Sequence, residues 1–262
     1  MYDYHIHSTF SLDGKNLLDD MVESAYRKGA KEICITDHIE LSSPFGDEIF
    51  DVDNYFERID NLRNKYLNMN IKKGIEIGVQ QDNLDRMDEF VNSKNFDFVL
   101  ASVHSSEGFG VHDELFIEGK TWDNVIESYY NEIYTCAKNF KNYQILGHID
   151  LIKRYHTELG NMNFKNHYGI IDEILKLVIE DGKGIEVNTG GIRYPKCNNI
   201  NPTKDILERY KKLGGEIITF GSDSHDIDSI LYGYNETIDI LKTLNYKYLS
   251  IFENGQVDFV KI

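Results

Sequence analysis

Short stretches rich in apolar and β-branched residues alternate along the chain with longer stretches in which apolar residues recur at helical spacing. This alternation predicts an α/β protein built around a parallel sheet. Seven strands are expected, over residues 3–7, 32–37, 71–79, 97–104, 144–148, 184–188 and 216–223. Residues 248–252 are a candidate for an additional late strand.

The helical stretches lie between these strands, over residues 15–29, 55–66, 122–140 and 168–179. Asn201 is predicted to cap a further helix, with Pro202 in the first turn and Gly214 at the end. Seven strand–helix units favour a closed barrel that forms one domain over residues 1–262. An open, doubly wound sheet would give a similar pattern, so the positions of the motifs have to decide.

Composition narrows the choice of partners. Twenty-eight Lys and Arg against 44 Asp and Glu give a net charge of −16, which argues against nucleic acid and anionic membrane surfaces as partners. The three cysteines are far apart and form no CxxC pair, so no disulfide framework is expected. No apolar run approaches the ~20 residues of a membrane helix, and no signal peptide is apparent. We therefore expect a reduced, cytoplasmic protein.

His5 and His7 are two residues apart in the first expected strand. Side chains two apart in a strand leave the same face, so both imidazoles can bind one metal ion. The same alternation places Asp3 on this face. A lone HxH pair is more typical of ordinary core or surface histidines, so it needs support from elsewhere in the chain.

That support comes from the other strand ends, because nearly every one finishes in residues that bind metals. They are Thr36-Asp37-His38, Gly74-Ile75-Glu76, Ser102-Val103-His104, Gly147-His148 and Gly221-Ser222-Asp223-Ser224-His225. A parallel barrel brings the carboxyl ends of all its strands to one rim, where active sites are built. Six imidazoles and two or three carboxylates exceed what one ion needs. The set predicts two or three divalent ions of zinc, manganese or iron, with Glu76 as the bridging carboxylate.

Asp13 follows the first strand and is either a further ligand or the cap of the first helix. Two arginines, Arg154 and Arg193, follow the strand ends at His148 and Asn188. A guanidinium can grip a phosphate in a bidentate manner, although solvated loop arginines are common. His112, His156 and His167 have no partner at ligand spacing and are expected to be loop or surface residues.

The motifs HIH, TDH, Glu76, SVHS, GHIDLI and GSDSH occur in the order of the polymerase and histidinol phosphatase (PHP) superfamily, which the chain resembles from Tyr4 to His225. GHIDLIKRY and EVNTGGIRYP resemble its stand-alone phosphatases. The resemblance implies a distorted (β/α)7 TIM-like barrel with three metals. It implies that His5, His7, Glu76 and Asp223 bind one metal, Glu76, His104 and His148 a second, and His38 and His225 a third. Asp13 stands where some relatives have a histidine ligand, and Arg154 and Arg193 match positions that hold the substrate phosphate.

The resemblance implies a metal-dependent phosphatase that hydrolyses L-histidinol phosphate, in histidine biosynthesis. Glu76, Asp223 and His225 are the candidate catalytic residues. Glu186 either pairs with the ammonium group of the substrate or supports a metal-binding histidine. Two alternatives are a phosphoesterase acting on a nucleotide or other small diester, and a metal-stabilised module without catalysis. The sequence leaves open which group protonates the leaving alkoxide.

Overall fold

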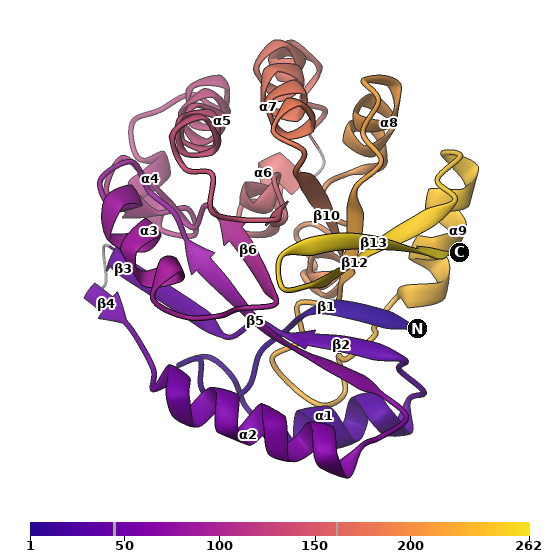
Figure 1. Ribbon diagram of the computed structural model, residues 1–262. Coiled ribbons are helices and arrows are strands. Elements are labelled where there is room, and N and C mark those ends of the chain that lie inside the picture. The colour runs from indigo at the N-terminus through magenta and orange to yellow at the C-terminus, as the bar shows by residue number, and fades with distance from the viewer. Residues whose placement is uncertain (44–45, 161) are drawn as a thin grey trace.

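The computed structural model describes residues 1–43, 46–160 and 162–262. Seven parallel strands follow one another around a nearly closed barrel in the order β1, β2, β5, β6, β9, β10, β11 (Figure 1). Their bounds are Tyr2–Ile6, Glu32–Ile35, Asn70–Gly78, Phe98–Ser102, Ile145–Leu146, Gly184–Asn188 and Ile218–Gly221. The barrel closes where the residues after β11 pair with β1, as in the 2.8 Å hydrogen bond from Asp223 N to His5 O. The predicted seven-stranded barrel is confirmed, and each expected strand overlaps an observed one.

The helices lie on the outside of this barrel (Figure 1). Their bounds are α1 Leu18–Arg27, α2 Val52–Lys65, α3 Leu84–Asn92, α4 Glu114–Ile117, α5 Trp122–Asn139, α6 Thr157–Gly160, α7 Tyr168–Glu180, α8 Lys204–Lys212 and α9 Tyr234–Thr243. Short 3-10 helices are η1 Leu151–Arg154, η2 Lys165–His167 and η3 Gly190–Arg193. Among the described helices, none combines the length and the apolar character that crossing a membrane would require.

Two of the expected helix starts are wrong. Helix α1 begins at Leu18, so Asp13 lies in the preceding loop and does not cap it. Helix α8 begins at Lys204 with Thr203 at the N-cap position, so Asn201 does not cap this helix either. The buried Asn201 amide instead accepts a hydrogen bond from Arg154 Nε at 3.0 Å. An Asn-Pro pair is typical of a helix start, but here the Asn201 side chain hydrogen-bonds to Arg154, which is distant in the sequence.

Apolar side chains fill two separate layers, as strand β6 shows. Val99 and Ala101 belong to the large core between strands and helices, whereas Phe98 and Leu100 belong to a smaller core inside the barrel. Ser102 is the next residue on the inner face, and its hydroxyl donates to Glu76 Oε1 at 2.6 Å. The inner face therefore changes from apolar to polar along the strand, which places the polar site at the carboxyl end of the barrel.

Strand β1 departs from simple alternation. Its register with β2 shifts between Asp3 and Ile6. Tyr4 packs in the inner core, with its ring centroid 5.1 Å from that of Phe98. Asp3 instead accepts backbone hydrogen bonds from Ser222 N at 2.9 Å and Leu231 N at 3.1 Å. The expectation that Asp3 shares the face of the two histidines is therefore wrong, because the irregularity changes which residues point inward.

The second strand is interrupted and then continues. After a break at Thr36 and Asp37, strand β3 (His38–Ser43) pairs with β5 beyond the end of β2 and forms a hairpin with β4 (Gly46–Glu48). The buried Asp37 carboxylate stabilises the break by accepting backbone hydrogen bonds from Ser8 at 2.6 Å and Ser11 at 3.1 Å. This extension was not expected, and it brings additional residues to the rim. A small hairpin of β7 (Ser105–Ser106) and β8 (Phe109–Gly110) also lies after β6.

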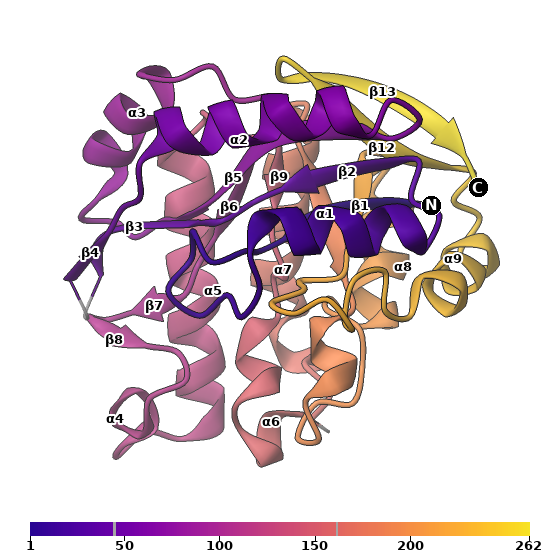
Figure 2. The ribbon, with the colours of Figure 1, turned by 90° about the horizontal axis from the view of Figure 1, so that it is seen from below.

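A C-terminal hairpin closes the opposite end of the barrel. Strands β12 (Tyr248–Glu253) and β13 (Gln256–Lys261) pair antiparallel and lie at the end where β1 begins (Figure 2). Phe252 enters the inner core, 5.1 Å from Phe98 and 6.1 Å from Tyr4 between ring centroids. Gly255 N donates to Asp97 O at 2.9 Å, just before β6 begins. The candidate late strand is thus confirmed as β12, and its role as an apolar plug of the barrel was not expected.

Replacing Phe252 by Ala should destabilise the fold without removing the site. The loss of a buried phenyl ring costs about 3 kcal/mol, which lowers Tm by roughly 6–12 °C in a chain of this size. The matched control is Phe259→Ala in the same hairpin, where the side chain is 45% exposed and the cost is about 0.5 kcal/mol. Thermal unfolding of both variants, with metal content measured in parallel, checks this. Equal decreases in Tm for the two variants would contradict the proposed role of Phe252 in filling this end of the barrel.

Candidate metal centre

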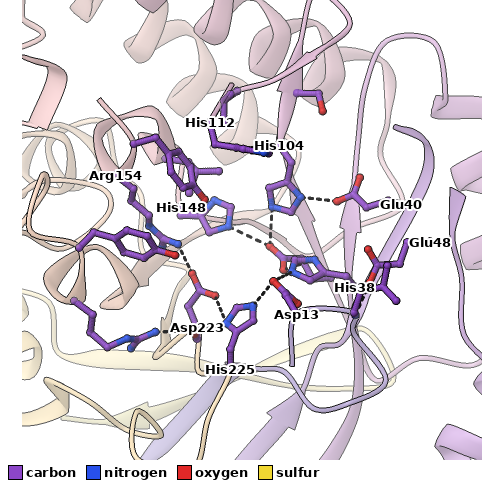
Figure 3. Close-up of a pocket in the computed structure, with 18 of the residues that line it drawn as sticks. Asp13, His38, Glu40, Glu48, His104, His112, His148, Arg154, Asp223 and His225 are labelled. Atoms are coloured by element: carbon purple, nitrogen blue, oxygen red, sulfur yellow. Dashed lines mark hydrogen bonds and ion pairs between the residues drawn. The ribbon is translucent and has the colours of Figure 1, made fainter. Parts of the chain in front are cut away.

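A cavity of about 670 Å³ opens at the carboxyl ends of the strands. Figure 3 shows His148 and Arg154 on the left, Glu40 and Glu48 on the right, and Asp223 and His225 at the bottom of the view. The expected residues that line the cavity are Asp13, His38, Glu76, His104, His148, Arg154, Arg193, Asp223 and His225. His5 and His7 are fully buried beneath it. The structure thus brings together residues from seven separate parts of the chain.

Glu76 lies at the centre of the cluster and has no exposed surface. Its Oε2 atom is 3.1 Å from His5 Nε2, 3.4 Å from His7 Nε2 and 3.0 Å from His38 Nδ1. Its Oε1 atom is 3.1 Å from His148 Nε2 and 3.4 Å from His104 Nε2. The two carboxylate oxygens therefore face two different sets of imidazoles, as a bridging carboxylate would.

Strand pairing explains why these residues meet. His38 is the register partner of Glu76 in the parallel pair β3–β5. His104 and His148 come directly after β6 and β9, which follow β5 around the barrel. The ring of His7 stacks with those of His38 and His225, at centroid distances of 4.3 and 4.2 Å, and the latter two rings are 6.0 Å apart.

Asp223 occupies a turn rather than the strand that was expected to carry it. Strand β11 ends at Gly221, and Asp223 has a left-handed φ of 56°, a conformation that Asp tolerates better than most residues. Arg193 holds this turn by donating to Ser222 O at 2.8 Å and Asp223 O at 2.7 Å. The Asp223 carboxylate lies 3.6 Å from both His5 Nε2 and His7 Nε2.

Arg154 is almost fully buried, and its guanidinium is tied to its surroundings on three sides. Nη1 donates to Asp223 Oδ2 at 2.6 Å, Nη2 to Asn188 Oδ1 at 2.6 Å and Nε to Asn201 Oδ1 at 3.0 Å. Burial opposes the charge on Arg154, but Asp223 together with Tyr155 and Tyr194 raises the pKa of the guanidinium above its ordinary value. Arg154 therefore fixes one oxygen of Asp223 while its remaining N–H bonds stay at the cavity wall.

Burial and neighbouring charges shift the pKa values of the cluster. Burial, together with the imidazoles of His225 and His38, holds the pKa of His7 well below its ordinary value. Burial opposes the charges of His5 and Glu76 as well. The carboxylates Glu186 and Glu76 nevertheless raise the pKa of His5, and the imidazoles hold that of Glu76 well below the usual range. The site thus keeps the Glu76 carboxylate ionised and favours a positive charge on His5 beside it.

The donor set fits divalent metal ions. His7 Nε2 and His38 Nδ1 are buried and, although they lie 3.4 and 3.0 Å from Glu76 Oε2, neither makes a well-directed hydrogen bond to a described residue, which is costly unless something else occupies their lone pairs. Among the residues that the structure describes, four groups of three side chains hold donor atoms within 4.8 Å of one another: His7–His38–His225, His5–Glu76–His148, His5–His7–Asp223 and His38–Glu40–His104. Imidazole with carboxylate and without thiolate is the ligand chemistry of zinc, manganese or iron.

The positions of Asp13 and Glu186 separate the alternatives left open for them. Asp13 Oδ2 lies 2.9 Å from His225 Nε2 and 3.9 Å from His38 Nε2. It therefore lies beside the two histidines that are expected to bind the third metal. Glu186 is buried behind His5, with Oε1 2.6 Å from His5 Nδ1 and Oε2 accepting from His148 N at 2.9 Å. Both oxygens of Glu186 are thus engaged by protein groups, which favours support of a histidine over contact with a substrate ammonium.

The sequence analysis missed Glu40. Its Oε1 atom is 2.5 Å from His104 Nδ1, and it lines the cavity. Glu40 is two residues after His38 and therefore shares its face of β3. This spacing could have identified Glu40, had the strand been expected to continue past Asp37.

The three remaining histidines lie outside the cluster around Glu76. His112 lines the outer part of the cavity, and His167 Nε2 is 2.9 Å from Asp123 Oδ1 at the surface of α5. His156 lies in the loop before α6, as expected, but it is buried rather than at the surface, with Nε2 2.9 Å from Val111 O.

Comparison with known proteins agrees with this geometry. The PHP domain family matches residues 3–190. A probable histidinol-phosphatase of Clostridium acetobutylicum is 32% identical over 251 residues, covering 94% of this chain and 95% of the relative. A histidinol-phosphatase of Lactococcus lactis subsp. lactis is 31% identical over 261 residues, covering 98% and 96%.

Among solved structures, the histidinol phosphate phosphatase of Lactococcus lactis subsp. lactis, complexed with zinc, L-histidinol and phosphate, superimposes with a TM-score of 0.89. It is 32% identical in sequence, and the match covers 98% of both chains. With the barrel, the metal-binding donor set and these matches in place, the chain belongs to the PHP domain family.

Proposed function

We propose that this protein is a metal-dependent phosphomonoesterase that hydrolyses L-histidinol phosphate to L-histidinol and inorganic phosphate. The observation that carries the proposal is the buried Glu76 carboxylate, which faces five imidazoles at the floor of a cavity large enough for a small substrate. The full-length similarity to histidinol-phosphatases supports the choice of substrate.

Two or three divalent ions would be held by His5, His7, His38, Glu76, His104, His148, Asp223 and His225, with Asp13 beside the outermost group. Such ions supply Lewis-acid stabilisation of charge on the phosphate and lower the pKa of a water molecule. The chain's own contribution is to hold the ligands in place. Glu76 bridges the two imidazole sets, and Asp223 is fixed by Arg154 and by the turn that Arg193 stabilises.

Arg154 and Arg193 are proposed to contact the phosphate group. Both line the cavity next to Asp223. A guanidinium has five N–H bonds, and the hydrogen bonds described above use three in Arg154 and two in Arg193. The remaining donors suit the charge that spreads over the phosphate oxygens during transfer.

The alcohol end of the substrate is proposed to face the acidic part of the cavity. Glu48, Asp226 and Asp13 line it beyond the imidazoles, and histidinol carries an ammonium group that carboxylates attract. The net charge of −16 further favours a small cationic substrate over nucleic acid. The three free, buried cysteines fit a reducing compartment, and we propose that the protein acts in the cytoplasm.

Replacing Glu76 by Gln should remove metal, because a neutral amide cannot bridge two cations. Elemental analysis should find more than one transition-metal equivalent in the wild-type protein and at least one fewer in Glu76→Gln. The matched control is Glu32→Gln, another buried strand carboxylate, which bonds to Tyr4 away from the cavity and should leave metal content unchanged. Wild-type metal content in Glu76→Gln would contradict the bridging role.

Histidinol phosphate should be hydrolysed with kcat/KM at least about tenfold above those of p-nitrophenyl phosphate and a small phosphodiester. Binding energy from the non-reacting end of the substrate orients the ester and lowers the barrier, and each tenfold in rate corresponds to ~1.4 kcal/mol. Steady-state kinetics on metal-loaded protein measures this directly. A preference for the diester would overturn the proposed activity while leaving the metal centre intact.

A further inference from the structure

Glu40 lies at the edge of the metal cluster but has no assigned function. It comes from β3, where its register partner on β5 is Gly78. Its side chain bends over that glycine, because a Cβ atom at Gly78 would lie 1.8 Å from Glu40 Oε2. The missing side chain at Gly78 thus creates the space in which the Glu40 carboxylate sits.

The carboxylate contacts the outer nitrogen of a metal-site histidine. Glu40 Oε1 is 2.5 Å from His104 Nδ1, while His104 Nε2 faces Glu76 Oε1 at 3.4 Å. A carboxylate only accepts hydrogen bonds, so Nδ1 carries a hydrogen and Nε2 is the nitrogen left to bind a metal. This is the tautomer that His104 needs in order to bind a metal between itself and Glu76.

The same arrangement recurs on the other side of the cluster. Glu186 Oε1 is 2.6 Å from His5 Nδ1, while His5 Nε2 faces Glu76 Oε2 at 3.1 Å. Here too a glycine makes room, because a Cβ atom at Gly221 would lie 1.9 Å from Glu186 Oε1. Each oxygen of Glu76 therefore faces an imidazole that a second carboxylate holds from behind.

We propose that Glu40 is a positioning residue that fixes the tautomer and orientation of His104 for metal binding, without itself binding metal. The alternative is direct ligation, since Glu40, His38 and His104 have donor atoms within 4.8 Å of one another. The 2.5 Å contact with Nδ1 favours positioning, because no ion fits between two atoms in hydrogen-bond contact. The proposal rests on the metal-dependent function proposed above.

Three variants test it, with zinc as the probe. Glu40→Leu removes the acceptor and should weaken zinc binding by about 10- to 100-fold, at unchanged stoichiometry under saturating zinc. Glu40→Gln keeps an oxygen that can accept from Nδ1, so it should recover most of this loss. Gly78→Ala retains Glu40 but pushes its flexible carboxylate away from His104, so it should weaken zinc binding about as much as Glu40→Leu.

The matched control is Glu132→Gln, because Glu132 is 8% exposed as a residue against 9% for Glu40, and its carboxylate accepts from Gln81 outside the lining of the cavity. Zinc affinity is measured by competition with a chelator, and histidine ring ¹⁵N NMR of the zinc-loaded protein reports the tautomer of His104. The expected result is a single Nδ1–H tautomer in wild type and Glu40→Gln, and its loss in Glu40→Leu.

Two results would overturn the proposal. If Glu40→Leu binds one zinc ion fewer at saturation, Glu40 is a ligand. If Glu40→Leu and Gly78→Ala both bind zinc as the wild type does, Glu40 has no role at the site. Failure of the wild-type protein to hydrolyse histidinol phosphate would refute the proposed substrate instead, because the ratio of zinc affinities does not depend on it.

Discussion

The burial of Glu76 is the constraint on which the rest of the site depends. A carboxylate without exposed surface, facing five imidazoles at 3.0 to 3.4 Å, is stable only when positive charge lies around it. The imidazoles supply this charge unevenly, because burial and the neighbouring imidazoles of His225 and His38 hold the pKa of His7 well below its ordinary value, whereas carboxylates raise that of His5. Divalent cations held by the carboxylate and the imidazoles would supply the rest of this charge, and the same cations would attract a phosphate group.

The fold meets this constraint by varying strand geometry at a few positions. The irregularity in β1 turns Tyr4 into the inner core and directs His5 toward Glu76. The break before β3 places His38 in register with Glu76. After β11, Asp223 adopts a left-handed backbone conformation in a turn, and Arg154 donates a hydrogen bond to its carboxylate. The apolar plug covers the end of the barrel that holds the inner core, opposite the polar end where the site lies.

The order of strands and the metal-type residues at their ends could be predicted from the sequence. Apolar alternation is a local property, and parallel strands necessarily gather their carboxyl ends at one rim. Features that depend on pairing between distant strands could not be predicted in this way. The inward turn of Tyr4, the extension that carries Glu40, and the use of Asn201 by Arg154 all arise from register and tertiary hydrogen bonds. Local patterns do not encode these contacts.

The central claim is that Glu76 joins two metal ions that carry out phosphate hydrolysis. Anomalous diffraction at the zinc edge, from crystals grown with zinc and phosphate, tests it most directly. The account predicts at least two zinc ions, one at each oxygen of Glu76, with phosphate bound beside them and within reach of Arg154 or Arg193. A single zinc ion, or several ions none of which contacts Glu76, would contradict it.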